Sequence, residues 1–261
     1  MTSSSFPPDV RARPAVATEY PVSTDSIATK IAMVSSMTGP EEACSLLREI
    51  SSELGCESSA FATFLQDDPW HQTYRFLLAC HPSWCAQYQR LAWFADDPWL
   101  LYARANVRPA LSTEIPSQTA KQEEVLALAR RFDVRAALIV PAPASAGLTR
   151  LGVLMLGSSD DMHFDKPGFA KLKVLARSLS SEFLDWYTVY LRDEFRRTSK
   201  LTDLDIELLK LERLGMSSKE IFRTTGLSTN AVDSRFQRMI SRLKVANRQA
   251  AAQLAAEYGL V

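Results

Sequence analysis

Residues 215–232 read GMSSKEIFRTTGLSTNAV, and this stretch decides the fold of the C-terminal part of the chain. Ser217 followed three residues later by Glu220 is a capping box, so a short helix should begin there. Gly226 supplies a tight turn, and Ser228 can cap a second, longer helix. A short helix, a glycine turn and a longer helix follow one another in this order in a helix-turn-helix.

The longer of these helices, which should end near residue 244, has an apolar and a polar side. At about 100 degrees per residue its apolar side chains fall within about 60 degrees of the centre of one side, and they are Val232, Phe236, Met239, Ile240 and Leu243. The opposite side carries donors and acceptors suited to base edges and phosphates, namely Asn230, Ser234, Gln237, Arg238 and Ser241. A plain solvated helix face has the same pattern, so the pattern alone leaves DNA binding and simple exposure equally open.

The charge of the chain bears on this choice once it is counted by region. The formal net charge is zero. From residue 196 to the end, 12 Lys and Arg stand against 7 Asp and Glu, whereas the remaining residues hold 18 against 23. A basic module attached to an acidic body is typical of a DNA reader joined to a regulatory domain.

Residues 201–261 resemble the helix-turn-helix domain of the LuxR family. The similarity lies in Leu201-Thr202, residues 215–221, Leu227-Ser228, Ala231-Val232 and residues 243–248. It implies binding to double-stranded DNA and pairing of two such domains with help from the Ala-rich residues 249–258. The DNA-contacting positions that it implies are Ser228, Thr229, Asn230, Asp233, Ser234, Gln237, Arg238 and Ser241. Asp205, Asp233 and Arg235 depart from the usual family residues, so the target sequence cannot be borrowed from a relative.

The part of the chain before residue 200 predicts a separate domain in which helices flank strands. Residues 1–25 are rich in Ser and Pro and should form a disordered tail. Strands are expected at residues 60–65, 74–79, 136–140 and 151–156, with Pro141 and Pro143 in the loop between the last two. Helices are expected twice between residues 27 and 54, from 82, from 98, from 119 and over 166–194.

The expected architecture is therefore α+β. An N-terminal α/β/α sandwich over residues 26–194, built on a mixed sheet between helical layers, should hold a small molecule. Residues 195–200 are polar and charged, no apolar period crosses them, and we expect a linker there. An all-α helix-turn-helix domain follows over residues 201–261.

Trp84, Tyr88 and Asp97 place polar groups in a largely apolar segment. An indole N–H, a phenol O–H and a buried carboxylate could together hold an amphipathic amide. From the residues alone, the preferred interpretation is that Trp84 and Tyr88 are core aromatics one helical turn apart, with Asp97 capping the helix that Pro98 begins.

The spacing His81-Pro82-Ser83-Trp84, Tyr88 and Asp97-Pro98 resembles the ligand-pocket signature of the quorum-sensing LuxR subfamily. The resemblance implies that the N-terminal domain binds an acyl-homoserine lactone. In it, Trp84 would donate to the lactone carbonyl, Asp97 would accept from the ligand amide, and Tyr88 would contact the amide carbonyl or the adjoining chain.

Three further positions of the implied pocket depart from that signature. Ser112 stands where the family commonly has a second Trp, Ala137 where a Gly is usual, and Met155 where a Ser or Thr often bonds the ligand amide. Losing one neutral hydrogen bond costs about 0.5–1.5 kcal/mol, so Met155 alone would not abolish binding. Losing an aromatic wall as well could change the ligand class. Other aromatic residues in or beside these segments could rebuild a wall, and they are Trp70, Trp93, Trp99, Tyr102 and Phe132.

Composition and spacing argue against other classes of protein. Apolar residues make up 46% and charged residues 23%, which is typical of a globular protein. No apolar run suits a membrane span or a secretory signal, so we expect a cytoplasmic protein that does not enter a membrane. The four cysteines and three histidines show no CxxC or HExxH spacing, and we expect no metal, no cofactor and no disulfide.

Two alternatives to a lactone-responsive regulator stay open. A small-molecule hydrolase could use Asp96, Asp97 and His81, but no GxSxG motif or partnered nucleophile is present, so we do not expect an enzyme. The second alternative is a LuxR-like regulator that responds to a non-lactone ligand or acts without one.

In the leading hypothesis, ligand burial favours a homodimer and sets two helix-turn-helix units at the spacing of two half-sites.

Overall fold

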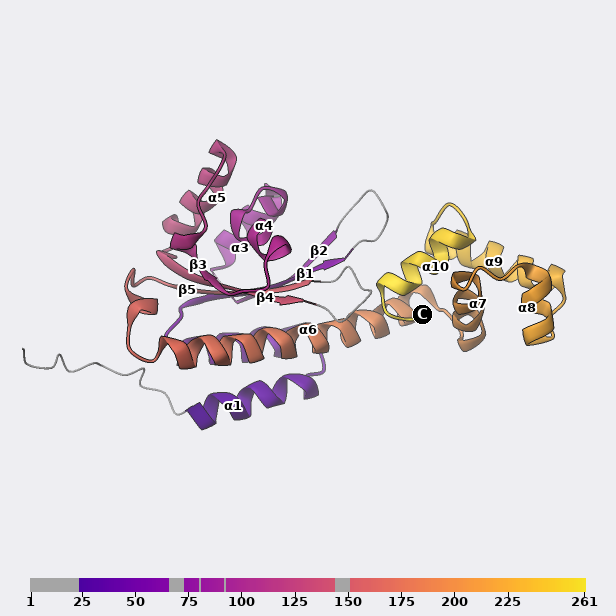
Figure 1. Ribbon diagram of the computed structural model, residues 1–261, viewed down its shortest axis with the longest axis horizontal. Coiled ribbons are helices and arrows are strands. Elements are labelled where there is room, and N and C mark those ends of the chain that lie inside the picture. Colours follow the sequence, from indigo (N-terminus) through magenta and orange to yellow (C-terminus); the bar gives the residue numbers. More distant parts are fainter. Residues whose placement is uncertain (1–23, 66–72, 80, 92, 144–150) are drawn as a thin grey trace, which may run out of the picture.

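The computed structural model describes residues 24–65, 73–79, 81–91, 93–143 and 151–261. The tail expected at residues 1–25 lies almost entirely outside the described residues, and its last two residues belong to the first helix, α1 (Thr24–Met33). Figure 1 places a helix-covered sheet and a smaller helical unit at the two ends of one long helix, α6 (Phe169–Ser199). Among the described helices, none has both the length and the apolar character needed to cross a membrane.

The sheet contains five described strands, and every pairing between neighbours is antiparallel. They are β1 (Ser58–Leu65), β2 (Thr73–Ala79), β3 (Ala110–Leu111), β4 (Ala136–Pro143) and β5 (Leu151–Ser158), in the order β2-β1-β5-β4-β3. The expectation of a mixed sheet is therefore wrong. Only residues 144–150 separate β4 from β5, and a parallel connection needs a dozen or more residues. The nearly continuous apolar runs of β4 and β5 reflect helices on both faces rather than parallel pairing.

Helices cover both faces of the sheet, as the expected α/β/α sandwich requires (Figure 1). One face carries α1, α2 (Pro40–Glu53) and α6; the other carries α3 (Pro82–Arg90), α4 (Pro98–Ala105) and α5 (Ala120–Arg131). On the α6 side, the fully buried rings of Phe61 and Phe183 lie 5.5 Å apart between centroids. Because side chains alternate along a strand, Ala60 and Ala62 face the other layer, where the cavity described below lies.

Strand β4 is longer than the sequence predicted, since Pro141 and Pro143 belong to it and not to a loop. Pro141 is paired with Val153 and Pro143 with Leu151 of β5. On its other side β4 pairs with β3 only at residues 138 and 139. Proline is tolerated in a strand where no neighbour needs its N–H, and the shortness of β3 provides that condition.

The linker expected at residues 195–200 is helical over most of its length, because α6 continues through it to Ser199. The side chains of residues 196–198 are exposed, whereas Ser199 is buried and Phe195 stacks on Tyr258 with ring centroids 4.0 Å apart. Lys200 ends the helix in the left-handed region, and Arg242 donates to its carbonyl oxygen at 2.8 Å. The C-terminal unit that follows contains α7 (Asp203–Arg213), α8 (Ser218–Thr225), α9 (Thr229–Leu243) and α10 (Arg248–Glu257).

Candidate functional site

An apolar cavity of about 60 Å³ lies between the sheet and the helices α3 and α4. The sheet lines it with Ala60, Ala62, Phe76, Ile139, Val153 and Met155, and the helices and their caps line it with Trp84, Cys85, Tyr88, Asp97, Trp99 and Leu100. The small side chains of Ala60 and Ala62 leave the space that larger strand residues would fill. The cavity is small beside those that hold a drug-sized ligand, about 300–1,000 Å³, so a larger ligand would have to move its walls.

Asp97 is the buried polar centre of this cavity, with 5% of its surface exposed. Tyr88 donates its hydroxyl to Asp97 Oδ2 at 2.6 Å, and the backbone N–H groups of Trp99 and Leu100 donate to Oδ1 at 2.8 and 3.4 Å. Burial raises the pKa of Asp97 above its usual range, although these three hydrogen bonds act in the opposite direction. The Asp97 carboxylate therefore combines two roles that the sequence offered as alternatives. It caps α4, and it also lies at the cavity.

Aromatic side chains pack around that polar centre. Phe132 stacks on Trp84 with the ring planes 11° apart, and Phe76 meets Tyr88 edge to face with centroids 5.9 Å apart. Tyr102 donates its hydroxyl to the carbonyl oxygen of Arg108. Trp70 and the side chain of Trp93, two other candidates for an aromatic wall, lie outside the described residues.

Five of the seven expected ligand-binding residues meet at this cavity: Trp84, Tyr88, Asp97, Trp99 and Met155. The structure does not bring Ser112 and Ala137 to it. Ser112 Oγ instead accepts the backbone N–H of Ala137 at 3.0 Å. Ser112 lines a second hollow beside α5, which touches the cavity at Trp99. The Ser112 hydroxyl, directly after β3, thus satisfies an N–H group of β4.

Sequence reasoning missed several residues of the cavity wall, above all Ala60, Ala62 and Val153. The period of two along β1 and β5 could have placed these small or branched residues on one face. Cys85 also lines the cavity and is disulfide-bonded, contrary to expectation. A disulfide needs only that two Cα atoms come within about 4.4–6.8 Å, which motif spacing does not reveal.

The residues of the hydrolase alternative do not converge on the cavity. The His81 ring packs on Phe132 with centroids 5.2 Å apart, and Asp96 pairs with Lys121 at 2.6 Å. Neither His81 nor Asp96 is among the cavity residues. Within the described ranges, no cluster of three or more His, Cys, Asp or Glu residues could hold a metal ion.

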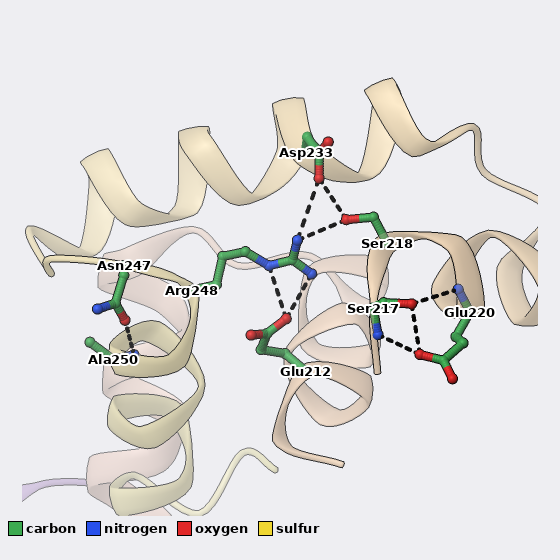
Figure 2. Close-up of polar contacts among 8 residues, drawn as sticks. All are labelled: Glu212, Ser217, Ser218, Glu220, Asp233, Asn247, Arg248 and Ala250. Carbon is green, nitrogen blue, oxygen red and sulfur yellow. Dashed lines mark hydrogen bonds and ion pairs between the residues drawn. The ribbon is translucent and has the colours of Figure 1, made fainter. Parts of the chain in front are cut away.

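The helix caps predicted for the C-terminal unit are present (Figure 2). The backbone N–H of Ser217 donates to Glu220 Oε2 at 2.8 Å, and the N–H of Glu220 donates back to Ser217 Oγ. Gly226 ends α8 at φ +73°, a conformation that favours glycine. Ser228 Oγ accepts the N–H of Ala231 at 3.2 Å and begins α9. The order of elements is that of a helix-turn-helix, with α9 as its longer second helix.

The two sides of α9 differ in exposure as the periodicity predicted. Val232, Phe236 and Met239 are buried. The expected DNA-contacting residues are exposed except Thr229, which is half-buried, and the exposed ones are Ser228, Asn230, Asp233, Ser234, Gln237, Arg238 and Ser241. We call the set Asn230, Ser234, Gln237, Arg238 and Ser241 the polar ridge. Arg238 makes no ion pair with any residue that the structure describes.

Asp233 differs from the ridge residues because it takes part in a polar network that joins four helices (Figure 2). Ser218 Oγ donates to Asp233 Oδ1 at 2.7 Å, and Arg248 Nη1 lies 3.4 Å from the same oxygen. Arg248 also donates to Glu212 Oε2 at 2.9 Å, and its guanidinium lies 4.0 Å from the centroid of Phe236. Asp233 thus has partners within its own unit, which its place on the helix could not reveal.

Three exposed basic residues of the C-terminal unit were not singled out from the sequence. Lys219 and Arg223 project from α8, and Lys244 follows α9. In the described part of the chain none of them forms an ion pair. Helix-turn-helix proteins set their first helix across the DNA backbone, where such free cations can reach phosphates. Counting charge by helix rather than by domain would have found them.

Residues 39–184 match the autoinducer binding domain family. A solved structure of SdiA from Escherichia coli is similar to this chain at 18% identity, with a TM-score of 0.71, and the match covers 90% of this chain and 98% of that one. A structure of SdiA in complex with octanoyl-rac-glycerol is also 18% identical, with a TM-score of 0.66, and the match covers 89% of this chain and 94% of that one. CepR2 from Burkholderia cenocepacia, described as an N-acylhomoserine lactone dependent LuxR family transcription factor, has a TM-score of 0.52 at 15% identity, with 63% and 96% covered. No curated protein matches the chain significantly by sequence.

Proposed function

Because the chain belongs to the autoinducer-binding-domain family of LuxR-type regulators, we propose that it binds an acyl-homoserine lactone or a related small amide in the cavity and controls transcription through its C-terminal helices. The observation that carries the proposal is the buried Asp97, bonded to Tyr88, in an otherwise apolar cavity. An acyl chain suits the apolar wall, and a polar head suits the carboxylate. An amphipathic ligand needs both.

Because Ser112 and Met155 depart from the family pattern, the residues of the cavity specify the acyl chain of the ligand more closely than its head group. Met155 lines the cavity without a hydroxyl for a ligand amide, and Ser112 is engaged with Ala137. An acyl glycerol, the kind of compound in one SdiA structure, has the same apolar chain and a neutral oxygen-rich head. A regulator that responds to such a non-lactone ligand is therefore the second candidate.

Adding a fitting ligand should raise the melting temperature of the purified protein, because a compound that binds only the folded state stabilises it. At a ligand concentration 100 times Kd the gain is about 2.7 kcal/mol. We would compare N-octanoyl-homoserine lactone, 1-octanoylglycerol and free octanoate in a thermal unfolding experiment. A rise with either of the first two, beyond that with octanoate, supports the proposal. No rise with any of them at millimolar concentration speaks against it.

A physical route between the two units runs through α6, which supports the proposal that ligand binding governs DNA binding. Its middle part packs under the sheet through Leu179 and Phe183, on the face opposite the cavity. Its last turn carries Phe195, which stacks on Tyr258 of the C-terminal unit. A ligand that shifts the sheet would thus act on a helix whose far end touches the DNA-binding unit.

We further propose that the regulator binds double-stranded DNA as a homodimer that spans two half-sites. The alanine face of α10 is already buried within its own unit, since Ala251, Ala252 and Ala255 pack against its neighbouring helices. Pairing through α10 would therefore use the exposed side that carries Gln249 and Gln253.

Replacing Arg238 by alanine should weaken DNA binding without unfolding the protein. The side chain is exposed on the polar ridge and free of ion pairs with described residues, so its cation is available to a base edge or a phosphate. Losing a base contact of this kind costs about 1–3 kcal/mol, whereas losing a phosphate contact lowers affinity by a similar amount for all sequences. Fluorescence anisotropy with DNA from upstream of the gene would measure the change. Arg192→Ala, which removes a half-buried arginine of α6, should leave DNA affinity unchanged. Equal weakening by both variants would contradict the role of the ridge.

A further inference from the structure

Trp99 separates the ligand cavity from the second hollow of the same domain. It follows Pro98 in the first turn of α4, and only 8% of its surface is exposed. Of the residues that line the cavity, it alone also lines the second hollow, whose volume is about 130 Å³. The walls of that hollow include polar groups from Ser112, Thr113, Arg130 and Arg135. The indole of Trp99 thus separates the apolar cavity from the more polar second hollow.

The indole N–H of Trp99 is a buried donor with no hydrogen-bond partner in the described part of the chain. Buried polar atoms nearly always have a partner, so an unpaired donor needs an explanation. A second buried indole, that of Trp186 on α6, donates to the carbonyl oxygen of Met37 at 2.9 Å. Trp99 therefore differs from Trp186 in a way that burial alone does not explain.

None of the neighbouring polar groups of the cavity accepts a hydrogen bond from this donor. Both carboxylate oxygens of Asp97 already accept, one from Tyr88 and the other from backbone N–H groups of α4. Met155, across the cavity, offers only a thioether sulfur, which is a weak acceptor. In the described part of the chain no group pairs with the indole N–H, so the donor is available to an oxygen atom that a ligand brings.

We propose that Trp99 is a specificity-determining residue whose indole N–H donates a hydrogen bond to an oxygen atom of the ligand. The inference rests on the proposed function of the cavity and adds to it the kind of head group that the cavity selects. That head group carries a carbonyl, ester or hydroxyl oxygen that reaches the wall of α4, in addition to the group that meets Asp97. A compound with an acyl chain and a single polar atom would leave one of the two sites unpaired and would bind more weakly.

The indole N–H resonances of the full-length protein, labelled with ¹⁵N at tryptophan, test this directly. The chain has five tryptophans, so each resonance can be assigned from its Trp→Phe variant, or the last by elimination if one variant fails to fold. We would add N-octanoyl-homoserine lactone or 1-octanoylglycerol to saturation. The Trp99 proton should move downfield and exchange more slowly with water, while the Trp186 proton should stay in place.

Binding affinity gives a second readout. Trp99→Phe keeps an aromatic ring but removes the donor, and it should bind the same probe about two- to tenfold more weakly, whereas Trp186→Phe should bind it as the wild type does.

The outcomes separate the inference from the proposed function. If a probe raises the melting temperature and yet leaves the Trp99 resonance and its water exchange unchanged, the inference is wrong and the proposed function stands. A Trp99 proton that is already downfield and protected without ligand would identify a bound water as its partner and would also overturn the inference. If neither probe binds, the proposed function and the inference fail together.

Discussion

Asp97→Asn is expected to weaken ligand binding at least tenfold while leaving the protein as stable as the wild type or slightly more stable. The amide keeps the oxygen that accepts from Trp99 and Leu100, so the cap of α4 survives. The second oxygen becomes an NH₂ group, which can accept neither from Tyr88 nor from a ligand amide. A hydrogen bond to a charged group contributes about 1.5–3 kcal/mol, or roughly 10- to 150-fold in affinity.

The expected gain in stability follows from the sign of the pKa shift. Burial holds the pKa of Asp97 above that of an exposed carboxyl, so the folded protein binds this proton more tightly than the unfolded chain does. A raised pKa contributes stability at low pH, which is lost as the pH rises through the folded-state value. Wherever the folded carboxyl is ionised, its burial costs stability, and the uncharged Asn removes that cost. Retaining such a charge at a cost in stability fits a residue kept for binding.

Isothermal titration with whichever octanoyl probe binds the wild type, together with urea unfolding, measures both effects. Thr119→Ala is the matched control, because it removes another N-cap of the same domain outside the cavity. It should lower stability by about 1 kcal/mol and leave ligand affinity unchanged. If Asp97→Asn binds the probe as tightly as the wild type does, Asp97 is only a helix cap.

The cavity was partly predictable from the sequence because its polar groups are rare residue types at fixed spacing. Trp84, Tyr88 and Asp97 lie on α3 and at the start of α4, so local helix geometry brings them together. Ser112 and Ala137 belong to segments that meet only through the pairing of β3 with β4. Their hydrogen bond depends on tertiary structure, and local patterns carry no trace of it.

The fold was predictable where one face of an element is buried and less so where tertiary contacts decide. Apolar patterns predict where the strands at residues 58–65 and 151–158 lie, but they do not predict whether neighbouring strands pair parallel or antiparallel. The charged residues 196 and 197 indicated a linker. The contact of Phe195 with Tyr258 is tertiary and could not be foreseen from that pattern. Asp233 was assigned to DNA for the same reason, since its partners Ser218 and Arg248 come from other helices.

The polar network around Arg248 leads to the second large prediction, that Arg248→Met destabilises the C-terminal unit by about 3 kcal/mol. Methionine fills much the same volume but leaves Glu212, whose side chain is 18% exposed, without its cation. It also removes the contact with Ser218 and the guanidinium over the Phe236 ring. Because the network joins α7, α8, α9 and α10, its loss should loosen the polar ridge as well as the core.

Hydrogen exchange of α9 peptides in the full-length protein would measure this effect locally, without assuming that both units unfold together. Arg196→Met is the matched control: it breaks an arginine ion pair with Asp203, whose side chain is 91% exposed, and should change exchange little. Arg248→Lys should fall between the two, because it keeps the charge and loses the planar fork that reaches both Glu212 and Ser218. If the amides of α9 are as well protected from exchange in Arg248→Met as in Arg196→Met, the apolar core alone holds the helices together. If the network does hold them, DNA affinity should fall with protection across the three variants, although Arg248 itself lies away from the ridge.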